Sequence, residues 1–120
     1  MQRGKLMMVA AERFEELKAS SRATNWRGRS GRFYALAAAR IDAFSLDGAE
    51  LYLLAADDCV LWVGTAADLI GEPSSRARFR AAMLEADAVF HVAAPQSDVD
   101  RMTLIWDLEG AEPVTGLSAA

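Results

Sequence analysis

The chain has 120 residues, of which 52% are hydrophobic and 25% are charged. This length corresponds to one domain and this composition to a globular protein, so a multi-domain enzyme and a disordered chain are excluded. The formal net charge of −4 argues against a general nucleic-acid binder and against adsorption to anionic membranes.

The sequence argues against a membrane span, a secretory signal and chemistry that needs several cysteines. The apolar runs fall short of the roughly 20 residues that a membrane span needs. The start of the chain lacks the clean apolar segment of a secretory signal, so we expect a cytoplasmic protein with no membrane partner. Cys59 is the only cysteine, which rules out an internal disulfide and a cysteine-built zinc site.

Charge is distributed unevenly along the chain. Residues 1–40 carry nine Lys or Arg and three acids, whereas residues 41–120 carry four Arg and fourteen acids. Aromatic residues interleave with the basic ones, which favours contacts with phosphates and stacked bases. The alternative is a basic segment that lies on the acidic body of its own chain or of a neighbour. The candidate nucleic-acid contacts are Arg27, Arg29, Arg32, Arg78 and Arg80.

The first part of the chain predicts one helix and leaves one segment open. Apolar residues recur every three or four positions over 5–19, which predicts an amphipathic helix that packs on the body or forms a homodimer. Small and polar residues over 24–31 predict a loop. Residues 33–46 begin with aromatic residues that favour a strand and continue with three alanines that favour a helix.

Two short apolar runs in the middle of the chain predict a β-hairpin. They span residues 50–55 and 59–63, and the turn signal Asp57-Asp58 separates them. Two adjacent acids supply too few oxygens for a calcium or magnesium site, so we interpret them as the turn. Cys59 opens the second run and is expected to be a small buried hydrophobe rather than a nucleophile.

Two helices and a third strand follow the hairpin. Thr65 is a suitable cap for a short helix, and Pro73 is a favoured first residue of a second helix that runs to about residue 87. Residues 88–93 predict the third strand, in which His91 is expected to be a structural residue. Residues 97–109 fit a helix capped by Ser97 or Asp98, although their alternation also fits a strand.

These elements predict an α+β fold with a small mixed sheet, made of the hairpin and the third strand. Helices flank this sheet, and an extra helix precedes it. The expected organisation is an N-terminal helix and basic loop over 1–32, a single α/β domain over 33–110, and a loose tail over 111–120.

The order strand–strand–helix–strand–helix carries two short motifs. Glu50-Leu51-Tyr52 lies in the first strand and Trp62-Val63-Gly64 ends the second, with Tyr52 and Trp62 ten positions apart. Thr65 and Asp68-Leu69 follow. This pattern resembles the GIY-YIG nuclease family over about residues 47–109, and the resemblance implies that Gly64, Thr65 and Asp68 form the backbone of its second motif.

The resemblance also implies which residues would carry nuclease chemistry. Family members hydrolyse phosphodiesters with two tyrosines, an arginine that holds the phosphate, and a glutamate that binds a divalent metal. Tyr52 matches the first tyrosine, whereas Trp62 replaces the second and can only donate a hydrogen bond. Glu72 stands at the arginine position, with Arg76 as the nearest cation, and Asp100 is the remaining candidate for the metal.

Three functions are compatible with these departures from the family. The first is a catalytically degenerate GIY-YIG-like binding module, without a cofactor, whose partner is DNA or a protein. The second is a phosphodiesterase with a rearranged site of Tyr52, Arg76 and Asp100 that uses magnesium or manganese. The third is an assembly protein that dimerises through the helix at 5–19. The missing charge contacts favour a protein that is not an enzyme.

Overall fold

The computed structural model describes residues 23–114, so the helix expected at 5–19 and the end of the predicted tail lie outside the described residues. Six strands form one sheet in the order β4-β3-β5-β2-β1-β6. The strands are β1 (Ala23–Arg27), β2 (Phe33–Ala39), β3 (Glu50–Ala56), β4 (Cys59–Thr65), β5 (Ala88–Ala93) and β6 (Glu112–Pro113). The helices are α2 (Ala66–Gly71), α3 (Pro73–Glu85) and α4 (Asp98–Glu109). None of these helices is long and apolar enough to cross a membrane.

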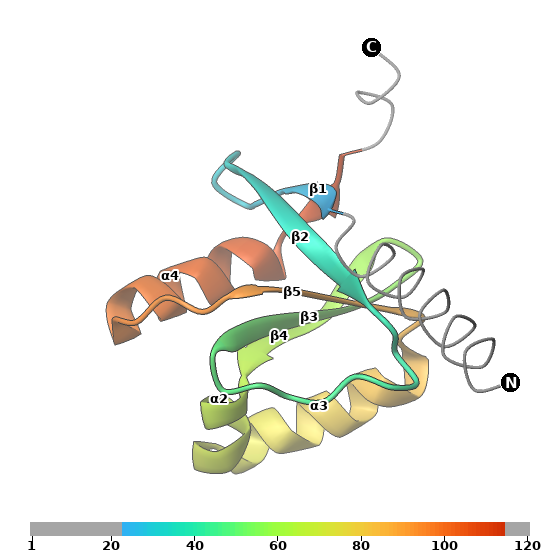
Figure 1. Ribbon diagram of the computed structural model, residues 1–120, viewed down its shortest axis with the longest axis vertical. Helices are drawn as coiled ribbons and strands as arrows, with labels where there is room; N and C mark the ends of the chain where they lie inside the picture. The colour runs from blue at the N-terminus through green and yellow to red at the C-terminus, as the bar shows by residue number, and fades with distance from the viewer. Residues whose placement is uncertain (1–22, 115–120) are drawn as a thin grey trace, which may run out of the picture.

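The expectation of a small mixed sheet is wrong. Every pair of neighbouring strands is antiparallel, and the sheet has six strands instead of three. The sheet curls into a half-barrel, with β2 crossing over one end (Figure 1). The fold is therefore α+β with one large antiparallel sheet.

Two of the missing strands, β1 and β2, come from the segment before residue 40, and the third, β6, pairs with β1 from within the tail expected to be loose. The loop expected over 24–31 is wrong in its first half, because residues 24–27 belong to β1 and only residues 28–31 form the turn to β2. The open segment 33–46 begins as strand β2. Its three alanines, residues 37–39, pair with Val89, Phe90 and His91 of β5. This pairing outweighs the helix propensity of alanine.

The predicted hairpin of β3 and β4 is confirmed. Asp57 and Asp58 have positive φ angles of 49° and 65°, as a tight turn between antiparallel strands requires. Leu61 is an extra residue in β4, because Ala55 pairs with Val60 while Leu54 pairs with Trp62, which makes a β-bulge.

Cys59 does not have the burial expected of it. Its side chain is exposed, because it is the first residue of β4 and lies beside the turn. The expectation of a buried hydrophobe at this position is therefore wrong.

The helix starts follow the predicted capping signals. Thr65 caps α2 in a capping box with Asp68, and Pro73 occupies the first turn of α3. Ser97 caps α4, so the segment left between helix and strand is a helix. The third strand is also confirmed, as β5.

The two faces of the sheet are covered by different helices. Leu51 and Leu53 of β3 pack in one core cluster with Leu108 of α4, whereas Tyr52 and Leu54 pack in a second cluster with residues of α3. Figure 1 shows α4 on one side of the sheet and α2 and α3 on the other. Among the described residues β4 ends the sheet, and its residues 60–63 line hollows together with residues of α3 and α4.

Candidate functional site

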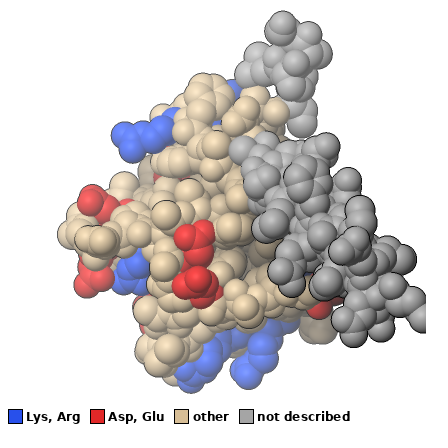
Figure 2. Space-filling model, in the orientation of Figure 1, with Lys and Arg blue, Asp and Glu red and all other residues tan. Residues whose placement is uncertain are grey.

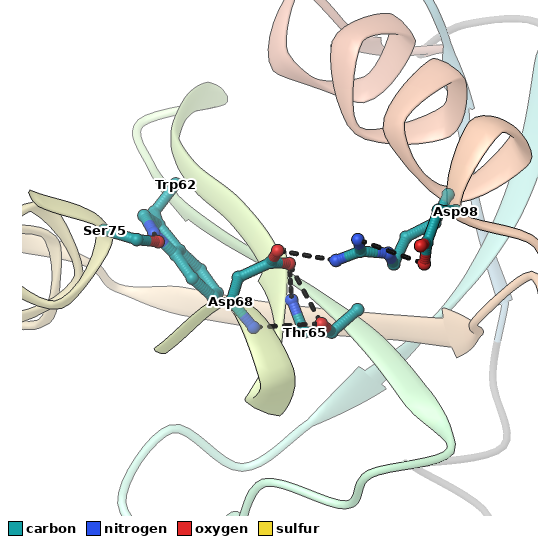
Figure 3. A network of polar contacts seen from close by, with 6 residues as sticks. Trp62, Thr65, Asp68, Ser75 and Asp98 are labelled. Atoms are coloured by element: carbon teal, nitrogen blue, oxygen red, sulfur yellow. Dashed lines mark hydrogen bonds and ion pairs between the residues drawn. The ribbon is translucent and has the colours of Figure 1, made fainter. Parts of the chain in front are cut away.

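Tyr52 and Trp62 lie on neighbouring strands and share one face of the sheet, but both are core residues, each 4% exposed. The Tyr52 hydroxyl donates to the carbonyl of Ser45 at 3.0 Å and accepts from the amide of Asp47 at 2.7 Å. Trp62 donates from Nε1 to Ser75 Oγ at 3.3 Å (Figure 3). Each polar group therefore has a structural partner within the protein.

The other residues of the expected nuclease site do not join this pair. Arg76 donates from Nη1 to the carbonyls of Leu69 at 2.9 Å and Ile70 at 3.1 Å, so it holds the end of α2. Asp100 is exposed in the first turn of α4, which packs on the opposite face of the sheet from Tyr52. The structure thus brings Tyr52 and Trp62 together and leaves the cation and the carboxylate elsewhere.

The donor set does not fit a divalent metal. Among residues 23–114 no three His, Cys, Asp or Glu side chains gather closely enough to hold one. Asp100 offers a single exposed carboxylate, and magnesium or manganese sites built on protein oxygens need several converging ligands.

The residues of the second motif form a helix cap. Asp68 Oδ2 accepts from the Thr65 amide at 2.8 Å, and Asp68 Oδ1 accepts from Arg101 at 2.6 Å (Figure 3). Burial raises the pKa of Asp68, but the hydrogen bonds from Thr65 and Arg101 outweigh it and lower the pKa. At Gly64 a Cβ would lie 2.7 Å from the Trp62 ring, so glycine lets the indole lie against the strand.

Two arginines at the end of β1 and in the turn after it, Arg27 and Arg29, contact the C-terminal part of the chain. Arg27 pairs with Glu112 at 3.1 Å, and both side chains are exposed. Arg29 donates from Nε to the carbonyl of Trp106 at 3.1 Å, and its guanidinium lies 5.1 Å from the centre of that indole ring. Arg32 is exposed. This agrees with the interpretation in which the basic segment lies on its own chain.

The candidate nucleic-acid contacts fall into two groups, one near the β1–β2 turn and one on α3. The face shown in Figure 2 has no continuous basic surface. There the basic atoms gather mainly at opposite ends of the view, with acidic atoms between them. Arg78 and Arg80 are exposed on α3. Arg29 and Arg78 do line one common hollow, but Glu109 lines it with them.

Asp107 anchors the β1–β2 turn to α4 and was not identified from the sequence. It is 3% exposed and accepts from the Ser30 amide at 2.6 Å, the Ser30 hydroxyl at 2.7 Å and the Tyr34 hydroxyl. Burial raises the pKa of Asp107, but these hydrogen bonds outweigh it and lower the pKa. Burial and the contact with Asp107 raise the pKa of Tyr34. An acid in the last turn of a helix gives no sequence signal for burial.

His91 links two strands. Its Nδ1 lies 2.7 Å from Glu50 Oε1, and its ring centre lies 6.0 Å from that of Tyr52. The side chains of His91 and Glu50 are 29% and 25% exposed. The contact agrees with a structural histidine in β5.

Three adjoining hollows follow the free edge of β4. Their volumes are about 420, 300 and 260 Å³, and Arg78 of α3 lines all three. Residues 60–63 of β4 form their floor, while α3 and α4 form the walls. We name this surface, between α3 and α4 over residues 60–63, the edge groove.

The two walls of the edge groove differ in chemistry. The α4 wall presents Met102, Ile105 and Trp106, and Trp106 is 51% exposed. The α3 wall presents the cation of Arg78. Acidic side chains lie at several points around the rim, so the groove combines an apolar wall with charges of both signs.

Sequence reasoning did not find the edge groove, because its walls belong to segments that are far apart in the chain. The exposed Met102 and Trp106 of α4 were the available signal, but their spacing fits a buried strand as well as a helix. Comparisons of the chain with protein-family models, with curated proteins and with solved structures give no match.

Proposed function

We propose that this chain is a non-catalytic interaction module that binds a protein partner in the edge groove. The observation that carries this proposal is the groove itself: an apolar wall, a charged wall and a strand edge open to one side. Binding surfaces of this kind combine apolar anchors with a polar rim. A cytoplasmic location, inferred from the sequence, is part of the proposal.

The state of the polar side chains supports a non-catalytic role. A general base needs a lone pair that a substrate proton can reach, and a phosphate clamp needs a free cation. The Tyr52 hydroxyl is bonded to two backbone groups inside the protein, and the Arg76 guanidinium donates to two carbonyls. A distant relation to GIY-YIG nucleases stays within the proposal as ancestry, supported by the order β3, β4, α2, α3, β5, α4.

The charges of the groove favour a protein over a nucleic acid. A polyanion needs a surface on which cations dominate, because phosphate contacts supply most of its affinity. The groove is lined by three arginines and four acids: Arg29, Arg78 and Arg101 against Asp68, Glu72, Glu85 and Glu109.

Selection of peptides from a random phage-displayed library tests this function. We expect the full chain to enrich peptides whose binding is lost in Met102→Asp, because Met102 lines the groove. Val99→Asp is the matched control: Val99 is an exposed apolar residue of the same helix that lines none of the three hollows. Peptides that bind both variants equally would show that the groove is not the binding surface.

A nuclease assay tests the alternative. We expect no cleavage of plasmid or branched DNA with magnesium or manganese, and no salt-dependent binding of short DNA in the micromolar range. Cleavage that disappears in Tyr52→Phe would overturn the non-catalytic assignment, because the mutation removes only the hydroxyl.

A further inference from the structure

We propose that the partner segment in the edge groove is an extended peptide that pairs with β4 as an added strand. Its apolar side chains face α4, and an acidic side chain faces Arg78. This inference rests on the proposed function, and it names the chemistry and the conformation of the partner.

The backbone of β4 supplies the first argument. Strand β4 ends the sheet, so its outer edge has no strand partner among the described residues. Such an edge offers amide and carbonyl groups to an incoming strand. In β4 this offer ends before Thr65, whose amide already donates to Asp68. The seven residues of β4 include no proline and no charged side chain, the features that usually block pairing at a sheet edge.

The bulge in β4 limits how long the added strand can be. Leu61 is the extra residue, and regular pairing with β3 resumes from Trp62 to Thr65. A bulge increases the local twist and interrupts a ladder. The edge therefore suits a short peptide segment and not the continuous growth of a sheet.

The walls of the groove determine the side-chain pattern of the partner. Successive side chains of an extended peptide point to opposite faces of the sheet, so one set meets α4 and the other meets α3. Met102 and Trp106 on α4 favour apolar side chains. Arg78 on α3 is exposed and takes part in none of the ion pairs found among the described residues, although four acids line the hollows with it. An unpaired cation favours a carboxylate of the partner opposite it.

The position of Arg78 disfavours a second copy of this chain as the occupant. Arg78 lines all three hollows and thus lies near the middle of the groove. Two copies that pair through β4 around a two-fold axis keep their α3 helices on the same side of the joined sheet. Such pairing brings the two Arg78 side chains toward each other, and like charges oppose it.

The wall formed by Trp106 is already ordered before a partner binds. Arg29 donates to the carbonyl of Trp106 and stacks on its ring, 5.1 Å from the ring centre. A side chain held in this way loses less conformational freedom on binding.

Designed peptides test the inference on the full chain. The probe is a capped, fluorescein-labelled peptide in which leucine alternates with threonine and the central threonine is replaced by glutamate. One control carries lysine at the centre, a second groups the leucines together, and a third has methylated backbone nitrogens along the edge that would pair. Fluorescence anisotropy measures the affinity of each peptide.

We expect the glutamate peptide to bind most tightly and each control peptide to lose at least about tenfold in affinity. Arg78→Glu should weaken the glutamate peptide at least about tenfold and strengthen the lysine peptide. Arg80→Glu is the matched protein control, because Arg80 is exposed on α3 and lines none of the three hollows. It should change either affinity less than about twofold.

The outcomes separate this inference from the proposed function. Equal binding of the methylated peptide, or equal effects of Arg78→Glu and Arg80→Glu, would overturn the strand-pairing inference while leaving an interaction module in place. Library peptides that bind the groove as helices would do the same. A dimer in sedimentation that Arg78→Glu stabilises would assign the groove to a second copy and overturn the inference. Failure of both library and designed peptides to bind would overturn inference and function together.

Discussion

Arg101 of α4 donates to Asp68 of α2 at 2.6 Å, and both residues line one end of the edge groove (Figure 3). The two side chains are only 21% and 16% exposed. Asp68 also accepts from the Thr65 amide, so the same carboxylate caps α2 and positions α4. The position of α4 at this end of the groove thus depends on a cap that the sequence predicts.

Arg101→Ala should lower the free energy of unfolding by about 1–2 kcal/mol, because Asp68 loses a charge-assisted hydrogen bond in a partly buried place. Urea denaturation at neutral pH measures this change. The control is Asp98→Asn, since Asp98 is 89% exposed and lies 3.4 Å from the same guanidinium. It should cost less than about 0.5 kcal/mol. Equal effects would mean that the Asp68 contact does not hold α4.

Asp107→Asn should destabilise the protein by about 2 kcal/mol at neutral pH and by less in acid. The pKa of Asp107 is lowered in the folded state, whereas in the unfolded chain it is about 3.9. Its contribution is therefore complete above pH ~4 and is lost as the pH falls through the folded pKa. Denaturation midpoints across acidic pH should converge for the two proteins. The control is Asp58→Asn in the exposed hairpin turn.

Gly28→Ala should destabilise the protein by about 1–3 kcal/mol, because its Cβ would lie 2.5 Å from Asp107 Oδ1 and displace that carboxylate. Gly48→Ala is the control, since a Cβ at Gly48 meets nothing within 4 Å. It should leave the free energy of unfolding within about 0.5 kcal/mol. Thermal unfolding of both variants provides the comparison, and a neutral Gly28→Ala would contradict the packing described at Asp107.

Tyr52→Phe should cost about 1–2 kcal/mol of stability, because the amide of Asp47 and the carbonyl of Ser45 lose the partly buried hydrogen bonds that they make with the Tyr52 hydroxyl. Peptide binding should be unchanged, since Tyr52 does not line the edge groove. Chemical denaturation and anisotropy measure the two effects. Weaker peptide binding with unchanged stability would show that Tyr52 belongs to the surface that binds the peptide.

Local signals predicted the elements of the second half of the chain. The turn at Asp57 and Asp58, the cap at Thr65 and the proline at Pro73 each act within a few residues, so their effects are visible in sequence. The first half depended on distant partners. The alanines of β2 form a strand because they pair with β5, and no local sequence pattern predicts that pairing.

The candidate site was predictable only in part. The pairing of β3 and β4, which places Tyr52 near Trp62, followed from the hairpin pattern. The hydrogen-bond partners of Tyr52 and Trp62 could not be predicted, because they belong to the loop at Ser45 and to Ser75 of α3. Spacing within a motif indicates which side chains share a face, but it does not say which hydrogen bonds they make.

Hydrogen–deuterium exchange of β4 with and without the glutamate peptide tests the central claim most directly. Pairing with an added strand should slow exchange of outward-facing amides within residues 60–63, while amides of β1, near the opposite end of the sheet, stay unchanged. Saturating peptide that leaves the exchange of β4 unaltered would contradict the pairing of the peptide with β4.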